Sequence, residues 1–370
     1  MIRIKKILLM LLLIIGIFPL VFATSCKKDP IVKADFSYHV LAVGNGNFTF
    51  LENNNTGHIV ILDCGNGLKA KQTDDLESSP ISNRKWGFER RTNVKKYFVD
   101  YLNHFHVTEI EAIFVSHNHA DHFNEIENML SNFKVDNLIM PIVYDSAKTQ
   151  IETYVKKTQN ESLNIDTTFS YKYSFMGIEF HNITAKLDHQ ALIDADYKAS
   201  EGPNATSMVI DFTVNGQTVL FTGDAIEMTV SPKKFDPNGI FKSLISKMNI
   251  NTFLLAHHGS TNSSTDKLLE YMGKNASSIK YSLISGTNHY SGNWWNASGN
   301  HSLASIQEVG YTKQCAKNTK IFITGTMTDD NSGTYDVTPD GENKSYEIEY
   351  KESGETLVIP NNSTVIHPEF

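Results

Sequence analysis

Three histidines and one aspartate fall within six positions of the stretch HNHADH: His117, His119, Asp121 and His122. In an extended loop, side chains two positions apart point the same way, so His117 and His119 can approach one ion together. Neutral imidazole suits zinc, and a carboxylate such as Asp121 adds the charge needed to hold a second ion. The stretch therefore predicts a site for divalent metal ions.

This stretch does not match a closed structural zinc site, because the chain has three cysteines in all and none of them lie close together. Further ligands must come from elsewhere in the sequence. Asp224 follows the apolar run VLFTG, His257 and His258 follow TFLLA, and His301 lies in the stretch GNHS. Loops at strand ends carry chemistry in α/β folds, so we expect these side chains to complete the site.

The segments around these residues alternate between strand and helix patterns. Strands are predicted at residues 58–63 and 110–116, and a helix at 94–106, where apolar residues form one stripe. The histidine-rich stretch therefore lies between a strand end and the next helix. Asn215 and Gly216 predict the turn of a β-hairpin. Two strand-like runs around the first glycine-rich turn, followed by residues 58–63, predict a meander at a sheet edge.

The beginning of the chain is typical of a secretory signal. Residues 1–25 have a basic start, an apolar run and then small residues before a cysteine. The letters FATSC resemble a bacterial lipobox, which predicts lipid on Cys26 and a tether over residues 26–35. Simple secretion and a retained membrane anchor are the alternatives. Lys27 favours the outer membrane, so we expect a cell-envelope lipoprotein whose exposed face, periplasmic or external, stays open.

The net charge limits the kinds of partner that the protein is expected to bind, whereas the cysteines leave its redox state open. The formal net charge is −8, which is a poor match for tight, nonspecific binding of nucleic acid. It does not exclude an anionic substrate held by a metal ion. Cys64 and Cys315 could form a disulfide in an oxidising compartment or remain buried thiols, and the sequence leaves both alternatives open.

The order ILDCG, SHNHADH, LFTGDA and LLAHHGS resembles the metallo-β-lactamase fold, and within it the hydrolase domain of ComEC/Rec2-type competence proteins. The stretch LAVGNGNFTFLE resembles the opening strand and turn of that branch, with Asn45 and Asn47 where Gln and Asp are expected. The resemblance implies an α/β fold, an αββα sandwich of two mixed β-sheets flanked by helices. It places the domain at residues 36–350 and a C-terminal tail at residues 351–370.

The resemblance also implies which residues hold the ions. His117 and His119 would bind a first ion, and Asp121 and His122 a second. Asp224 would bridge the two ions. The implied cofactors are thus two divalent metal ions, expected to be Zn²⁺, with Mn²⁺ as the alternative.

The roles of the remaining histidines stay open between alternatives. His257 is the implied distal ligand of the second ion, and His301 competes for that position. His258 or His301 would donate a proton to the leaving group, so both join Asp121 as candidate catalytic residues. The resemblance places Asp63 behind the ligands, where it would orient a ligand histidine or its loop.

One position departs from the pattern of the family. Many members have a further histidine on the first ion, about twenty residues before the bridging aspartate. Asn204 occupies that place here, in the stretch GPNATS. His189 lies further upstream and could reach the site instead, or it could be an ordinary core or surface histidine.

These residues predict an exported metal-dependent hydrolase that uses a metal-bound hydroxide on phosphodiester or phosphate-ester bonds. The expected substrate is anionic and contains phosphate, and nucleic acid is one candidate. The alternative is a catalytically inactive binding module of the same fold at the cell envelope.

Two further groups of side chains would indicate the type of substrate. A groove formed by the basic residues Arg84, Arg90, Arg91 or Lys95 would favour an anionic polymer. Trp294 and Trp295 would bind a quaternary ammonium group, stack on bases or sugars, or simply pack their own loop.

Overall fold

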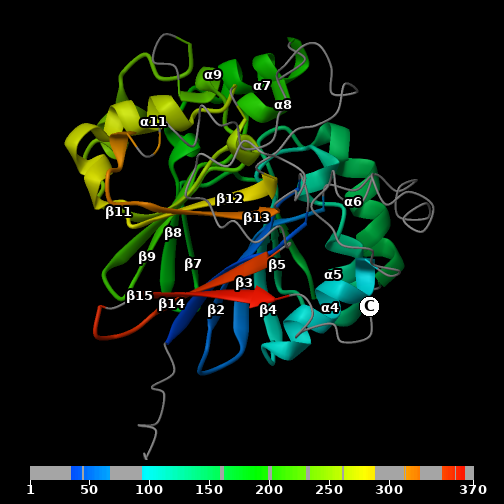
Figure 1. The fold of residues 1–370 in the computed structure, drawn as a ribbon. Helices are drawn as coiled ribbons and strands as arrows, with labels where there is room; N and C mark the ends of the chain where they lie inside the picture. The colour runs from blue at the N-terminus through cyan, green and yellow to red at the C-terminus, as the bar shows by residue number, and fades with distance from the viewer. Residues whose placement is uncertain are drawn as a thin grey trace, which may run out of the picture. The chain divides into compact units, whose positions relative to one another are not determined.

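Two β-sheets stacked face to face form the centre of the molecule, as the computed structural model shows in Figure 1. The structure describes residues 35–43, 46–66, 94–158, 162–198, 202–230, 234–260, 262–287, 312, 314–325, 344–354 and 356–362. All of them belong to one unit, Ala34–Phe370.

The first sheet has eight strands in the order β15-β14-β1-β2-β3-β4-β5-β6. Their bounds are β1 (Phe36–Val40), β2 (Phe48–Asn53), β3 (His58–Cys64), β4 (Glu109–Phe114), β5 (Asn137–Ile139), β6 (Asn164–Asp166), β14 (Lys344–Tyr350) and β15 (Thr356–Asn362). The strands from β15 to β3 run antiparallel to their neighbours. Those from β3 to β6 pair in parallel.

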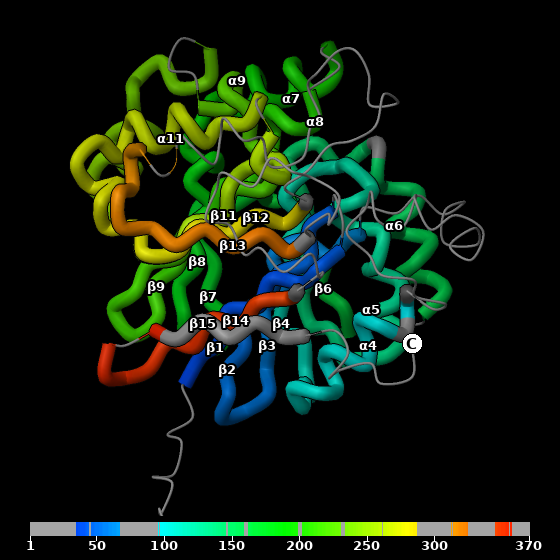
Figure 2. Tube along the Cα trace, in the orientation of Figure 1, coloured from blue at the N-terminus to red at the C-terminus, as the bar shows by residue number. Residues whose placement is uncertain are grey.

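The predicted meander of β1, β2 and β3 is present, but its predicted place at a sheet edge is wrong. β14 pairs antiparallel with β1, so Tyr38 lies opposite Ile348 and the meander is internal. Figure 2 shows this pairing of the two ends of the described chain. The partner strand lies some 300 positions away in the sequence, and a local pattern carries no information about it. The sheet also continues past residue 350, because β15 pairs with β14.

The second sheet has seven strands in the order β13-β12-β11-β10-β9-β8-β7. Their bounds are β7 (Lys172–Phe175), β8 (Ile178–Asn182), β9 (Ile210–Val214), β10 (Gln217–Phe221), β11 (Ile250–Leu254), β12 (Tyr281–Thr287) and β13 (Lys320–Gly325). The half from β10 to β13 is parallel. The predicted hairpin of β9 and β10 is confirmed, with Asn215 at φ 47° and Gly216 at φ 72° in its turn.

Helices cover the outer face of each sheet. Helices α4 (Val94–His104), α5 (Ile126–Asn132) and α6 (Asp145–Thr158) pack on the first sheet. Helices α7 (His189–Lys198), α9 (Glu227–Val230), α10 (Ile240–Ile245) and α11 (Thr265–Met272) pack on the second, near the short α8 (Gly202–Ala205). Four 3₁₀ turns complete the described elements: η1 (Ala120–His122), η2 (Ile183–Lys186), η3 (His257–Gly259) and η4 (Gly273–Ser278).

A third apolar cluster lies between the sheets, so that strands such as β1, β2 and β3 are buried on both faces. Tyr38 and Phe114 from the first sheet pack there with Phe180 and Phe212 from the second. Tyr38 and Phe212 meet edge to face, with ring centroids 5.8 Å apart. Burying the inner faces removes large aromatic surfaces from water, which is the main driving force for stacking the sheets. The expected αββα sandwich is therefore confirmed.

The two cysteines that could have formed a disulfide are free thiols. Cys64 is buried in the cluster under α4 and α5, whereas Cys315 is half-buried against the cluster on the second sheet. Because the clusters lie on different faces of the sandwich, the two sulfur atoms have no route to one another. Among the described helices, none combines the length and the apolar character that a membrane span requires.

Candidate metal centre

The histidine-rich stretch begins at His117, three positions after the end of β4, and runs into η1. His117 and His122 are fully buried, whereas His119 is half-buried and the Asp121 side chain is 34% exposed. The ring of His117 lies 4.2 Å from that of His122 and 4.8 Å from that of His119, measured between centroids. The turn of η1 thus gathers the imidazoles that the sequence keeps a few positions apart.

Asp224 approaches these histidines from the second sheet. It follows β10 after Gly223, whose φ is 49°. A Cβ atom at Gly223 would lie 2.8 Å from the side chain of Ser116, so glycine is needed for the close approach of the two loops. Asp224 Oδ1 lies 3.2 Å from His122 Nε2, and its Oδ2 lies 3.9 Å from His117 Nε2. The two carboxylate oxygens therefore face different histidines.

The adjacent pair His257 and His258 follows β11 and adopts a strained backbone. Both residues have left-handed conformations, with φ of 49° and 55°, which non-glycine residues rarely adopt. His258 Nε2 lies 3.8 Å from Asp121 Oδ2 and 3.6 Å from Asp224 Oδ2. The strain aims this imidazole at both carboxylates.

His257 points to a different neighbour. Its Nε2 lies 3.8 Å from Asp224 Oδ2 but also 3.3 Å from the side-chain nitrogen of Asn204. Asn204, in α8, is fully buried. The two neighbouring histidines thus both lie within 4 Å of Asp224 Oδ2, but their other neighbours differ: Asp121 for His258 and Asn204 for His257.

Asp63 supports the centre from behind, as its predicted orienting role requires. It lies one position before the end of β3, has φ of 61° and is fully buried. Its Oδ1 accepts a hydrogen bond from the Ser116 backbone N–H at 2.7 Å, and its Oδ2 accepts one from the Ser116 hydroxyl at 2.8 Å. Oδ2 also accepts a hydrogen bond from His122 Nδ1 at 2.6 Å. Asn47 donates to the same oxygen at 3.3 Å.

These contacts fix the same tautomer in three histidines. His122 Nδ1 donates to Asp63, and His258 Nδ1 donates to the Ser285 carbonyl at 2.7 Å. The Ser116 hydroxyl donates its one hydrogen bond to Asp63, so its oxygen accepts a hydrogen bond from His117 Nδ1 at 3.0 Å. Each imidazole therefore presents its Nε2 toward the carboxylates. This is the usual outer hydrogen bonding of metal-binding histidines.

The electrostatics of the centre reflect closely packed, buried charges. Burial alone would lower the pKa of His122, but the carboxylates of Asp224, Asp63 and Asp121 raise it well above its ordinary value. Burial would likewise raise the pKa of Asp224, yet His122, His258 and His257 hold it well below its usual range. The pKa of His117 is lowered by burial and by the neighbouring histidines. A proton on His122 thus supplies the positive charge that a bound cation would otherwise supply to balance the carboxylates.

The residues fit divalent metal ions. The Nε2 atoms of His117, His122 and His258 are buried and have no hydrogen-bond partner among the described residues. Two groups bring three ligand atoms within 4.8 Å of one another: His117, His122 and Asp224, and Asp121, His122 and His258. Ligands of one tetrahedral zinc ion lie roughly 3.4 Å apart, which is close to the separations around Asp224.

The outcome differs among the other predicted residues. His119 lies beside His117 but outside the two groups. His189 does not reach the centre: it is exposed, its Nε2 donates to the Ala185 carbonyl at 3.0 Å, and its ring contacts Phe169. Asn204 is the residue at the centre instead. Lys95 is exposed on α4. His301, Trp294, Trp295, Arg84, Arg90, Arg91, Asn45 and Cys26 lie outside the described residues.

Two residues of the centre were missed by the sequence analysis. Ser116 immediately precedes His117, and its place between a strand end and a ligand was a usable signal. Ser285, in β12, accepts a hydrogen bond from His258 through its backbone carbonyl. Every residue type has this group, so the sequence gives no sign of the contact. Asp196 was also missed: both its oxygens lie 3.4 Å from the side-chain nitrogen of Asn118, within the histidine-rich stretch.

A comparison with solved structures finds several that are similar to this chain. The short form of human tRNase Z has a TM-score of 0.36 at 10% identity, covering 84% of this chain and 98% of its own. A diphosphatase of the PhnP family has a TM-score of 0.39 at 8% identity, covering 84% and 96%. An isothiocyanate hydrolase from Delia radicum gut bacteria has a TM-score of 0.40 at 11% identity, covering 78% and 97%. These names describe the activities of those proteins alone.

No curated protein matches the sequence. One family model does, and its description is the metallo-beta-lactamase superfamily. The match spans residues 41–278, which is more than half of the chain and contains every ligand candidate of the two groups. The chain therefore belongs to the metallo-β-lactamase superfamily of metal-dependent hydrolases.

Proposed function

We propose that this protein is an exported, metal-dependent hydrolase of phosphodiester or phosphate-ester bonds. One observation carries the proposal: three buried histidines keep Nδ1 bonded and direct an unpartnered Nε2 toward Asp121 and Asp224. Burying this many polar groups is costly unless something compensates them. Divalent cations would compensate both the lone pairs of the histidines and the charge of the carboxylates.

The contacts support two ions rather than one. Asp224 turns Oδ1 toward His122 and Oδ2 toward His117 and His258. We assign His117, His119 and Asp224 to a first ion. We assign His122, His258, Asp121 and Asp224 to a second. Asp224 would then be shared by the two sites.

In this assignment His258 replaces His257 as the distal ligand. The Nδ1 of His258 is held by the Ser285 carbonyl, as expected of a ligand, whereas the Nε2 of His257 faces the amide of Asn204. His257 is then the nearest histidine to Asp224 that is not a ligand, and we place it next to the leaving group, with its Nε2 accepting a hydrogen bond from the Asn204 amide. Asn204 orients it.

When bound, divalent ions lower the pKa of water toward about 7 and polarise a phosphoryl or carbonyl oxygen. The chain does the rest. Asp63 and Ser116 hold His117 and His122 in their tautomers, and the buried position of both excludes bulk water. A pair of metal sites with a shared carboxylate suits in-line displacement at phosphorus, which is why we favour phosphate esters.

The cellular setting belongs to the same proposal. Lipid on Cys26 would attach the enzyme to the cell envelope, with the outer membrane as the proposed location, and its substrate would be met there. The order of motifs favours the ComEC/Rec2-type branch. The fold alone does not identify a substrate.

Hydrolysis of bis-p-nitrophenyl phosphate by the chain starting at Lys27, with Zn²⁺ or Mn²⁺, tests this function. His119→Ala and Asp224→Ala should abolish turnover, and elemental analysis should show two ions per wild-type chain. His258→Ala should lose one ion, whereas His257→Ala should keep both ions and lower kcat. His189→Ala is the matched control, because that histidine lies away from the centre.

The outcomes separate the alternatives. Turnover that survives Asp224→Ala would contradict a role for the centre. Two bound ions without turnover would point to a bond other than a phosphate ester. A wild-type chain that binds no metal and hydrolyses nothing would support the inactive binding module.

A further inference from the structure

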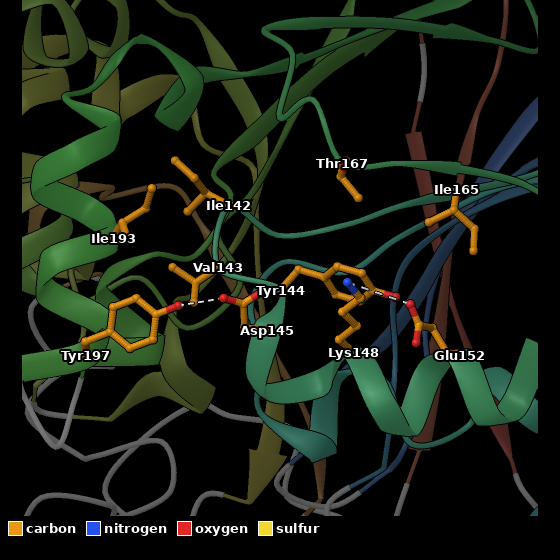
Figure 3. A pocket seen from close by; sticks show the side chains of 10 residues that line it. All are labelled: Ile142, Val143, Tyr144, Asp145, Lys148, Glu152, Ile165, Thr167, Ile193 and Tyr197. Atoms are coloured by element: carbon orange, nitrogen blue, oxygen red, sulfur yellow. Dashed lines mark hydrogen bonds and ion pairs between the residues drawn. The ribbon is translucent and has the colours of Figure 1, made fainter.

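A pocket of about 560 Å³ opens between α6 and α7, and no step of the proposed reaction uses it. Figure 3 shows the ten side chains around it. Its volume falls within the range of about 300–1,000 Å³ that is usual for small-molecule sites. The lining residues are Ile142, Val143, Tyr144, Asp145, Lys148, Glu152, Ile165, Thr167, Ile193 and Tyr197.

The topology places this pocket next to the metal centre. Strands β4, β5 and β6 are parallel neighbours, so their carboxyl ends meet at one edge of the sheet. The histidine-rich stretch follows β4. Val143 follows β5, and Thr167 follows β6. The pocket therefore lies along the same edge of the sheet as the metal centre, beside the ends of the next two strands.

Helix α7 forms a wall that the pocket shares with the metal loop. Asp196 contacts Asn118, which lies between His117 and His119. The next residue, Tyr197, lines the pocket and donates its hydroxyl to Asp145 Oδ2 at 3.0 Å. Figure 3 shows this bond spanning one side of the pocket. A group attached to a phosphate at the centre would thus reach Tyr197 by passing Asn118.

The lining disfavours a second anion. Asp145 and Glu152 contribute two carboxylates against the single ammonium of Lys148, which lies 4.0 Å from Glu152. The remaining lining is mostly apolar, with four aliphatic side chains and two tyrosine rings. Tyr197 as a whole residue is 61% exposed, so its side chain is available to a ligand. This composition suits an uncharged organic group and repels a phosphate chain.

Tyr144 adds a specific polar requirement. Its hydroxyl oxygen is buried and has no hydrogen-bond partner among the described residues. A buried hydroxyl without a partner costs free energy, and a ligand that supplies the partner recovers it. In Figure 3 this hydroxyl points toward the side of the pocket where Glu152 lies.

We propose that the pocket binds the organic substituent of the substrate. The substituent is a ring-sized, uncharged group with a hydroxyl or carbonyl that bonds the Tyr144 hydroxyl. This inference rests on the proposed function and narrows it, because it selects small phosphate esters over polyanionic chains such as nucleic acid. Tyr197 would cover one face of the ring.

Esters that share p-nitrophenolate as leaving group and differ in the second substituent test the pocket by kinetics. The phenyl ester should have a KM about tenfold lower than the methyl ester, the factor that roughly 1.4 kcal/mol of ring burial gives. A 4-carboxyphenyl ester should lose that advantage. Tyr197→Ala should raise the KM of the phenyl ester about tenfold and leave the methyl ester within about twofold.

A control and two polar variants sharpen the result. Tyr171→Ala removes a tyrosine that stacks on His181, away from the pocket, and should change neither ester. Tyr144→Phe should raise the KM of a 4-hydroxyphenyl ester more than that of the phenyl ester. Glu152→Gln should narrow the gap between the phenyl and 4-carboxyphenyl esters.

Binding of p-cresol, followed by saturation-transfer NMR, tests the pocket without any turnover. Binding that is lost in Tyr197→Ala and kept in Asp224→Ala is the expected result. If no ester is hydrolysed but p-cresol binds in this way, the pocket stands and the proposed function fails. If esters are hydrolysed with equal KM for phenyl and methyl and p-cresol does not bind, the function stands and the pocket proposal is overturned.

Discussion

Replacing Asp63 by asparagine should weaken metal binding without touching a ligand. The carboxylate accepts hydrogen bonds from the Ser116 N–H, the Ser116 hydroxyl and His122 Nδ1, at 2.7, 2.8 and 2.6 Å. Asparagine keeps one acceptor oxygen and introduces two N–H donors. If the asparagine oxygen still accepts from the Ser116 backbone N–H, the side-chain NH₂ group faces the Nδ1–H of His122. Two hydrogen-bond donors then point at one another.

His122 can relieve that conflict only by turning its ring or by moving its proton to Nε2. Either change removes the Nε2 lone pair from the metal site. A hydrogen bond to a charged group is worth about 1.5–3 kcal/mol, which corresponds to roughly a 10- to 150-fold change in an equilibrium constant. Loss of such an outer partner commonly costs about 10- to 100-fold in metal affinity. We therefore expect the Zn²⁺ dissociation constant of Asp63→Asn to rise by about 10- to 100-fold.

Competition with a chromophoric chelator measures this dissociation constant directly. Asp211→Asn is the matched control, because Asp211 is also mostly buried and bonds a histidine, His181 Nδ1 at 3.2 Å, on the outer face of the second sheet. Circular dichroism of both metal-free variants verifies that they fold. A Zn²⁺ affinity within about twofold of wild type in Asp63→Asn would refute the reasoning, as would an equal loss in Asp211→Asn.

Three further predictions concern protons and backbone space. Burial raises the pKa of Glu125 from 4.5 to about 7, so the native state holds a proton that the unfolded state has released, and stability falls as pH rises between these values. In Glu125→Gln, the free energy of unfolding should fall by about 3 kcal/mol less between pH 4.5 and pH 8 than it does in the wild type. Urea denaturation at these two pH values measures the difference. The carboxylates raise the pKa values of His122 and His258 despite burial, so protons compete with metal. Calorimetry in two buffers should show proton release and an affinity that increases with pH. Gly65→Ala places a Cβ 2.0 Å from the Asp121 carbonyl oxygen and should lower both the melting temperature and metal affinity.

Each of these predictions has a contrasting result. An unchanged pH slope in Glu125→Gln would show that another group is responsible. A metal affinity independent of pH would mean that both histidines are neutral in the metal-free protein. For Gly65, the comparison is Gly177→Ala, where φ is 75° but nothing lies within 4 Å. Its backbone strain should cost about 1–2 kcal/mol and leave metal binding unchanged.

The sequence predicts the position of the centre well because its ligands stand at strand ends. β4, β10 and β11 are short apolar runs, and His117, Asp224 and His258 follow within a few positions of their ends. Parallel strands bring such ends to one edge whatever the detailed register. The fold class followed from the same alternation of strands and helices, together with the resemblance.

Other features depend on contacts that are distant in sequence. The pairing of β14 with β1 moved the meander into the sheet interior. The different orientations of His257 and His258 depend on left-handed backbone angles and on a carbonyl from β12. The pocket depends on how α7 packs beside α6. None of these is encoded in a local pattern of residue types, so they appear only once the chain is folded.

The ligands come from both halves of the sandwich: His122 from the first sheet and Asp224 from the second, about a hundred positions apart. Bound ions would therefore act as a reversible crosslink that closes a long loop. A covalent link of that span removes chain entropy worth about 4–5 kcal/mol at 25 °C. Because the ligands meet only after the sheets stack, the crosslink would form late in folding, and its main effect would be on the lifetime of the folded chain. For a protein exported to the cell envelope, as we propose, that lifetime would decide how long the protein works.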